Sequence, residues 1–180
     1  MSIYFITGNK NKFEEARKIV PDLEQLDIDL AEIQSNDPVD VIKAKLKEAF
    51  NHCKGEFVVE DTSLCLNCLG GLPGPLTKWF LKIIGNEGLF KIASALGNFS
   101  AEAKTGIGYA KSSEDIHFFT GVIKGKIVSP RGNNGFGWDP IFEVENLGKT
   151  FAELTIEEKN EISMRRKALQ EFKIFLEKAI

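Results

Sequence analysis

The opening of the chain constrains its fold more than any other segment. A short apolar run of β-forming residues, Ile3–Ile6, leads into a turn that contains Gly8. Apolar residues then recur at helical spacing from Phe13 to Val20, and Pro21 ends the helix. A strand, a glycine turn and a helix in this order indicate a domain that mixes both kinds of element.

Hydrophobic periodicity and turn residues predict the remaining elements. Strands are expected over residues 23–29, at Phe57–Val59, and over 101–111, 115–121 and 122–128. Helices are expected over residues 38–52, 76–84 and 87–96, and Thr155 and Glu158 open a last helix with a capping box. We therefore predict a single α/β domain over residues 1–180, with two lobes around a cleft.

Composition limits the class of protein. A chain of 180 residues suits one domain, and a formal net charge of −3 gives no reason to expect a nucleic-acid partner. Three cysteines, an odd count, fit a reducing compartment better than a disulfide framework. No apolar run is long enough to cross a membrane, and the N-terminus lacks the features of a signal peptide. We expect a cytoplasmic protein.

The first turn is a candidate phosphate-binding site. A turn that opens a helix presents main-chain N–H groups and the positive end of the helix dipole, and both attract phosphate. Gly8 lets the backbone approach a ligand closely, and Lys10 and Lys12 add positive charge. The alternative interpretation is an ordinary strand-to-helix turn with solvated lysines.

Two adjacent acids follow the apolar strand Phe57–Val59. Glu60 and Asp61 point to opposite faces if the strand continues through them, so one can face a cleft while the other is held from behind. A carboxylate beside a triphosphate can hold Mg²⁺ or activate water. The alternative is a pair of charges that begins a polar turn.

Two further segments could contact a nucleotide. A planar base could stack on Phe136 or Trp138, which lie in a glycine-rich segment, although such aromatic residues can equally belong to the core. Lys159, Ser163 and Arg166 fall near one face of the predicted last helix. A solvated charged helix is the alternative there.

The order of these motifs resembles the inosine triphosphate pyrophosphatase family. The resemblance is carried by TGNKNK from Thr7, VEDTSL from Val59, GGLPGP from Gly70 followed by Lys78-Trp79-Phe80, FGWDP from Phe136 and EEKNEIS from Glu157. It covers nearly the whole chain. It implies a long mixed central sheet with two lobes that flank a substrate cleft, dependence on Mg²⁺, a purine nucleoside triphosphate as substrate, and a homodimer.

The resemblance also implies a role for individual residues. Glu32 and Asp61 would hold Mg²⁺, and Asp61 with Glu60 would form the catalytic pair. The triphosphate and sugar would contact Thr7, Gly8, Asn9, Lys10, Asn11, Lys12, Lys45, Asp61, Thr62, Lys78 and Lys159. The base would contact Phe136, Gly137, Trp138, Asp139, Ser163, Met164 and Arg165.

Base selectivity follows from hydrogen-bond donors. Arg165 offers only N–H groups, which suit the 6-oxo group of hypoxanthine or xanthine and would be left unpaired by the 6-amino group of adenine. Met164 departs from the family pattern, which has histidine at this position. Because methionine cannot donate a strong hydrogen bond, we expect weaker or shifted discrimination, and Met164→His should sharpen selectivity for ITP over GTP.

The expected activity is hydrolysis of deaminated purine nucleoside triphosphates, ITP, dITP and XTP, to the monophosphate and pyrophosphate. Two alternatives remain open on the sequence. One is a related pyrophosphatase with a different base preference, for which Met164 leaves room. The other is a nucleotide-binding module without catalysis, which would have no need of a water-activating carboxylate.

Overall fold

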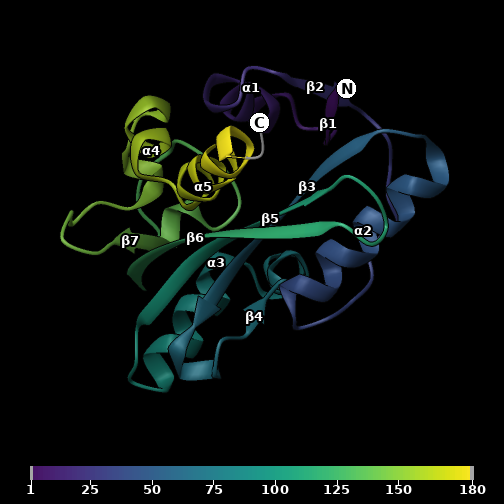
Figure 1. Cartoon of the computed structure of the whole chain (residues 1–180). Helices are drawn as coiled ribbons and strands as arrows, with labels where there is room; N and C mark the ends of the chain where they lie inside the picture. Colours follow the sequence, from purple (N-terminus) through teal and green to yellow (C-terminus); the bar gives the residue numbers. More distant parts are fainter. Residues whose placement is uncertain (1, 179–180) are drawn as a thin grey trace. The chain divides into compact units, whose positions relative to one another are not determined.

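The computed structural model describes residues 2–178. Within them a mixed seven-stranded sheet has the order β2-β1-β3-β5-β6-β7, with β4 paired to β3 (Figure 1). The strands are β1 (Ile3–Ile6), β2 (Leu23–Leu26), β3 (Glu56–Leu66), β4 (Pro73–Gly74), β5 (Ser100–Ala110), β6 (Ile116–Ile127) and β7 (Phe142–Val144). The α-helices are α1 (Lys10–Ile19), α2 (Pro38–His52), α3 (Thr77–Ala95), α4 (Ile156–Ile162) and α5 (Met164–Lys178). The predicted α/β class is confirmed.

The chain forms two compact units. The first comprises Met1–Asp61, Thr105–Gly121 and Arg165–Ile180, and the second comprises Thr62–Lys104 and Val122–Met164. The long strands β3, β5 and β6 contribute residues to both. Among residues 2–178, no helix combines the length and the hydropathy that a membrane span requires.

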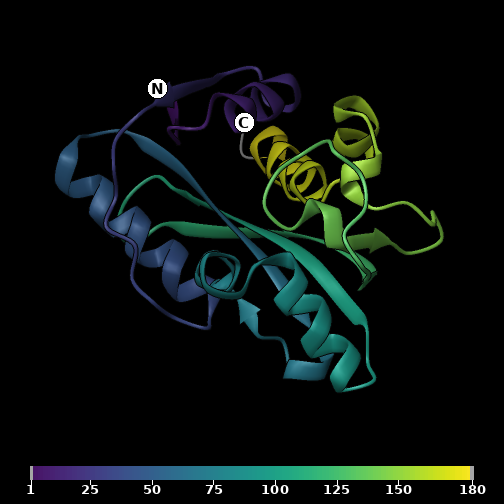
Figure 2. The same cartoon turned by 180° about the vertical axis from the view of Figure 1, so that it is seen from behind.

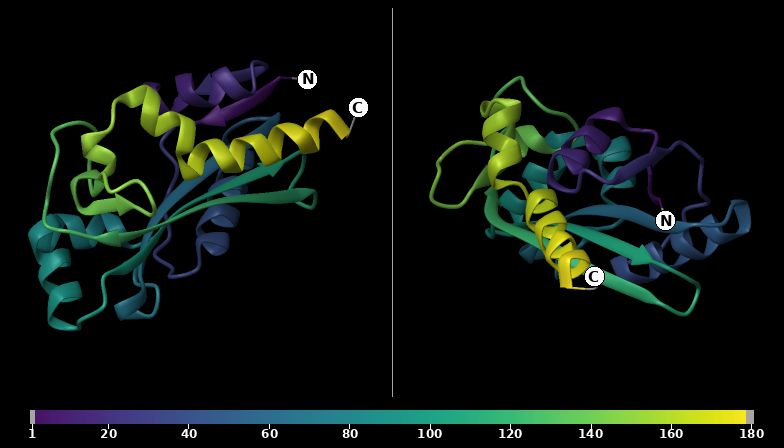
Figure 3. Two further views of the ribbon diagram at one scale, coloured as in Figure 1. Left: turned by 90° about the vertical axis from the view of Figure 1, so that its left-hand side faces the viewer. Right: turned by 45° about the horizontal axis from the view of Figure 1, so that its top comes forward.

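The first unit has helices on both faces of its strands, as α5 and α2 illustrate (Figure 3). Successive side chains of a strand point to opposite faces. Phe57 and Val59 accordingly pack in the cluster that contains residues of α2, while Val58 packs in the cluster with α1 and α5. An apolar run of three residues therefore serves two cores, which explains why it shows no alternation.

The parallel strands bring several loops to one edge of the first unit. β1 pairs in parallel with both β2 and β3, and the register places Phe5 opposite Val58. β1 and β2 therefore end close to the level of Val59, and β3 continues beyond them with Glu60 and Asp61. The carboxyl ends of parallel strands are where α/β proteins build their sites.

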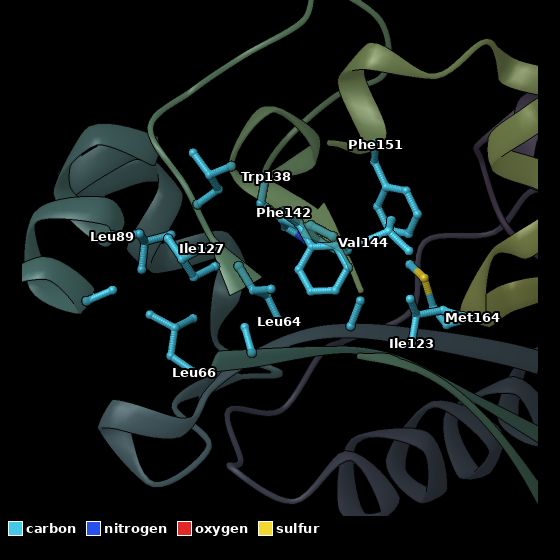
Figure 4. Packing of buried hydrophobic residues seen from close by; sticks show 14 of the residues in the cluster. Leu64, Leu66, Leu89, Ile123, Ile127, Trp138, Phe142, Val144, Phe151 and Met164 are labelled. Carbon is cyan, nitrogen blue, oxygen red and sulfur yellow. The ribbon is translucent and has the colours of Figure 1, made fainter. Parts of the chain in front are cut away.

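The second unit is built around a hydrophobic cluster that includes Leu64, Phe142, Phe151 and Met164 (Figure 4). Helix α3 consists of two helical segments that meet at Gly85, where φ is 66° and ψ is −174° (Figure 2). The sequence predicted two helices on either side of this point, and the two segments of α3 agree with that prediction.

Four elements differ from the sequence prediction. β2 ends at Leu26 rather than at residue 29. β3 does not end at Val59 but runs to Leu66, because β4 supplies a hydrogen-bonding partner at Leu64 and Cys65. β6 is one strand over the region predicted as two. The last helix is interrupted at Ser163, whose ψ of 152° is extended. Lys159, Ser163 and Arg166 therefore do not share a helical face as predicted.

Candidate active site

The turn between β1 and α1 is ordered by its own side chains. Asn9 caps the helix, since its Oδ1 accepts from the N–H groups of Asn11 at 3.0 Å and Lys12 at 3.2 Å. Thr7 Oγ1 in turn accepts from the Asn9 N–H at 3.1 Å. The prediction of N–H groups free for phosphate is therefore wrong for Asn11 and Lys12. The side chain of Lys12 still points into the site, while Lys10 and Asn11 are exposed.

A cavity of about 200 Å³ lies at this edge of the first unit. Its walls come from the end of β1, the segment after β2, the middle of β3, and the helices α1 and α2. It is lined by Ile6, Thr7, Gly8, Lys12, Ile28, Asp29, Leu30, Glu32, Lys45, Val59 and Glu60. Both lysines and carboxylates line the cavity. This combination is expected of a site that binds an anion together with a metal cation.

Glu60 is held by cations on the face of β3 that carries α1 and α5. Arg165 donates to both of its oxygens, from Nε at 2.6 Å and from Nη2 at 3.0 Å, and Lys12 Nζ lies 3.0 Å from Oε1. Burial alone would raise the pKa of Glu60, but the charges of Arg165 and Lys12 outweigh it and hold that pKa well below its usual range. Glu60 is therefore ionised and is a weak base.

Glu15 completes this ion-pair cluster and was not predicted from the sequence. Arg165 Nη1 donates to Glu15 Oε2 at 2.7 Å, and both side chains are buried. Burial lowers the pKa of Arg165, but Glu60 and Glu15 raise it overall, so the guanidinium stays charged. A signal was present, because Glu15 shares a helical face with Ala16 and Ile19, where an apolar residue is expected.

Asp61 faces the opposite side of β3. Lys45, buried on α2, places its Nζ 3.7 Å from Asp61 Oδ1, 2.9 Å from Glu32 Oε1 and 3.2 Å from the Glu60 carbonyl oxygen. Glu60 and Asp61 thus point to opposite faces of β3, as the sequence predicted. The side chain that lines the cavity is Glu60, which is also the one held by cations, so the predicted division into one acid in a cleft and one held from behind does not apply. One ammonium stands between two carboxylates.

The residues predicted to hold Mg²⁺ fit that ion. Glu32 and Asp61 converge on a single cation, Lys45, which leaves one net negative charge in this group. Mg²⁺ is usually bound by one or two carboxylates together with phosphate oxygens. In the part of the chain that the structure describes, no group of three or more acidic, histidine or cysteine residues could hold a metal by itself. The donor set suits a Mg²⁺ site that a phosphate ligand completes.

In the second unit an aromatic ring lies exposed on an ordered loop. Phe136 is 60% exposed, although its N–H donates to Asp139 Oδ2 at 2.9 Å. Lys159 Nζ lies 2.6 Å from the same oxygen and 5.0 Å from the centre of the Phe136 ring. A side chain at Gly135 would be strained, because φ is 78° and a Cβ there would lie 2.1 Å from Asp139 Oδ2, so that carboxylate would have to move.

Several residues predicted to contact the nucleotide do not line the cavity of the first unit. Trp138 is buried and stacks edge-on against Phe142 at 5.6 Å between ring centres, so it belongs to the core. Ser163 is also buried, whereas Lys78 is exposed near the start of α3. Thr62 is half-buried in β3. Of the five predicted lysines, the structure brings Lys12 and Lys45 to one cavity.

Comparison with known proteins assigns the chain to a family. Residues 3–175 match the model of the Ham1 family. This chain belongs to the Ham1 family. The resemblance found in its motifs is thereby confirmed.

Similar proteins cover almost the whole of this Ham1-family chain. The inosine triphosphate pyrophosphatase of Schizosaccharomyces pombe is 42% identical over 180 residues, which cover 98% of this chain and 95% of that protein. The inosine triphosphate pyrophosphatase of Fusarium vanettenii is 47% identical over 171 residues, 93% of this chain and 91% of that protein.

Solved structures agree with the fold. The Staphylococcus aureus Ham1 protein has a TM-score of 0.83 at 28% identity, and covers 99% of this chain and 100% of its own. The nucleoside-triphosphatase, or dITP/XTP pyrophosphatase, of Mycobacterium abscessus has a TM-score of 0.78 at 26% identity, with 96% and 98% covered. Both likenesses extend over both units of this family member.

Met164 stands where the resemblance predicts a histidine, and it is only 3% exposed. It packs in the same cluster as Ile123, Val144 and Phe151 (Figure 4). We expect Met164→His to lower the free energy of unfolding by about 1–3 kcal/mol, because an imidazole in an apolar cluster loses hydration. Thermal melting of the two proteins measures this.

A matched change separates size from polarity at this position. Met164→Leu keeps the volume and the apolar character, so it should cost much less than the histidine variant. If Met164→His is as stable as the parent and leaves the ITP to GTP ratio of kcat/KM unchanged, residue 164 is neither a core position sensitive to polarity nor part of base selection.

Proposed function

We propose that this chain hydrolyses ITP, dITP and XTP to the nucleoside monophosphate and pyrophosphate in the presence of Mg²⁺. The observation that carries the proposal is the cavity of the first unit, which Lys12, Lys45 and Glu32 line, together with the contacts of Lys45 with both Glu32 and Asp61. Membership of the Ham1 family and the names of its relatives support the same activity.

The triphosphate would be bound chiefly by charge. Lys12 and Lys45 supply ammonium groups inside the cavity, and Thr7, Gly8 and Asn9 supply the turn before α1. We keep Lys10, Asn11, Thr62, Lys78 and Lys159 as proposed contacts of the phosphates and sugar. Glu32 and Asp61 would hold Mg²⁺, which neutralises phosphate charge as the leaving group departs.

Asp61 is the better candidate for the base that activates water. Glu60 is committed to Arg165 and Lys12, and its lowered pKa opposes proton transfer to it. In the proposed step the water oxygen bonds to the α-phosphorus, the bond from that phosphorus to the bridging oxygen breaks, and pyrophosphate leaves. Asp61 takes the proton of the water. Glu60 would act as a positioning residue, since its carbonyl oxygen accepts from Lys45.

The base would stack on Phe136, whose ring is exposed and whose loop is held by Asp139. Arg165 has five N–H donors, and three of them bond Glu60 and Glu15. We propose that the remaining donors meet the 6-oxo group. Gly137, Trp138, Asp139, Ser163 and Met164 then support the base pocket, chiefly as its frame.

Pyrophosphate release from a panel of triphosphates tests the proposal. We expect fast turnover of ITP, dITP and XTP with Mg²⁺, slow turnover of ATP and GTP, and loss of turnover when the metal is chelated. Fast turnover of a different base would keep the chemistry and change the substrate. Binding of nucleotides without turnover of any would favour the non-catalytic module. A homodimer and a cytoplasmic location stay predictions.

A further inference from the structure

Asn86 begins the second half of α3, directly after the bend at Gly85. Its Nδ2 donates to the main-chain carbonyl oxygen of Gly137 at 2.9 Å, across 51 residues of sequence. Its Oδ1 is buried and has no hydrogen-bond partner within residues 2–178. The side chain therefore makes one long-range bond and leaves one buried acceptor unpaired.

Such an arrangement does not help the fold. A buried acceptor without a partner is unfavourable. A shorter apolar side chain would avoid this cost. Any benefit of Asn86 must then come from its hydrogen bond to the Gly137 carbonyl oxygen.

That bond reaches into the turn that carries Phe136. The Asp139 N–H donates to the Phe136 carbonyl oxygen at 3.2 Å, and this bond closes a turn with Gly137 and Trp138 at its centre. Gly137 has φ of 62°, and glycine adopts positive and negative φ at similar cost, so the residue type alone does not fix the conformation of this turn. The bond from Asn86 holds the peptide between Gly137 and Trp138 in the observed conformation.

We propose that Asn86 is a positioning residue for base recognition, which fixes the orientation of the Phe136 ring through the carbonyl of Gly137. The proposal rests on the proposed function, in which the base stacks on Phe136. The first half of α3 is anchored in its own right, because the Leu64 N–H donates to Thr77 Oγ1 at 3.1 Å and that hydroxyl donates to the Gly74 carbonyl at 2.5 Å.

The substitution Asn86→Asp removes the donor at almost constant shape and places a carboxylate against the Gly137 carbonyl. We expect the KM for ITP to rise about tenfold, with kcat nearly unchanged and a lower ITP to GTP ratio of kcat/KM. Asn86→Ala should raise KM in the same way without lowering the melting temperature, because it also removes the unpaired oxygen. This second variant keeps the test valid if the aspartate prevents folding.

Asn98→Asp is the matched control. Asn98 lies in the same unit and uses its Oδ1 to accept from the Ser100 N–H at 3.0 Å, a bond that aspartate preserves. The control adds the same charge, and its KM and kcat for ITP should match those of the parent. A tenfold rise in KM for the control would attribute the effect to charge and overturn the proposal.

A double-mutant cycle with Phe136→Ala decides whether Asn86 acts through the ring. Phe136→Ala should itself raise the KM for ITP, and adding Asn86→Asp should then have no further effect. Independent, multiplying effects would overturn the positioning role while leaving the base platform in place. An unchanged KM in Phe136→Ala would instead overturn the platform, and the role of Asn86 with it.

Discussion

Replacement of Asp61 by asparagine is expected to lower the kcat for ITP about a thousandfold or more, because the amide cannot accept the proton of the attacking water. ITP should still bind, since Lys12 and Lys45 remain in the cavity. Stopped or single-turnover assays of pyrophosphate release give the rate. Equilibrium binding of ITP with Mg²⁺ to the same variant gives the dissociation constant.

Two further variants show whether the loss of kcat is specific to Asp61. Asp29→Asn likewise removes one negative charge, here from the lining of the cavity, and should change kcat little. Glu32→Gln should raise the Mg²⁺ concentration needed for half-maximal turnover, because it removes one of the two carboxylates beside Lys45. If Asp61→Asn loses binding and turnover together and behaves as Glu32→Gln at high Mg²⁺, Asp61 holds the metal only, and the water is activated elsewhere.

Substitution of Arg165 by methionine should lower the free energy of unfolding by about 3–5 kcal/mol, because it leaves the buried carboxylates of Glu60 and Glu15 without their shared cation. Urea denaturation of parent and variant measures the difference. The double variant Arg165→Met with Glu60→Gln should recover part of the loss, since a neutral amide is less costly to bury than an unpaired charge.

The single variant Arg165→Met should also change how the free energy of unfolding depends on pH. The pKa of Glu60 is lower in the folded chain than its ordinary value of 4.5, so the unfolded chain binds more protons in acid. The stability that Glu60 contributes is therefore complete above that value and is lost as the pH falls below it. Removing Arg165 should flatten this acid slope. An equal slope in both proteins would mean that another carboxylate governs acid unfolding.

Local patterns in the sequence were enough for the elements that position the phosphate site. The glycine turn, the helix that starts at residue 38 and the apolar run Phe57–Val59 each depend on neighbours in sequence, and the structure agrees with the predicted positions. The opposite directions of Glu60 and Asp61 also follow from the period of a strand alone. These features need no knowledge of distant contacts.

The remaining features depend on partners that are far away along the chain. Arg165 bonds Glu15 and Glu60 across 150 and 105 residues, so its position in a buried ion-pair cluster was not visible in the motif around it. The continuation of β3 likewise depends on pairing with β4. The break at Ser163 was missed because capping at Thr155 predicts where a helix begins and carries no information on where it ends.

The frame of the Phe136 loop has a consequence for how substrate preference can evolve. The loop is held by main-chain and polar bonds: Arg131 N–H to the Pro140 carbonyl, Asn134 to Ala152 and Leu154, and the Phe136 N–H to Asp139. None of these bonds uses the exposed ring itself. Position 136 can therefore accept other side chains at little cost in folding. Under the proposed function, a change at this single codon would alter the base preference, while the lysines and carboxylates proposed to act on the phosphate chain stay under separate selection.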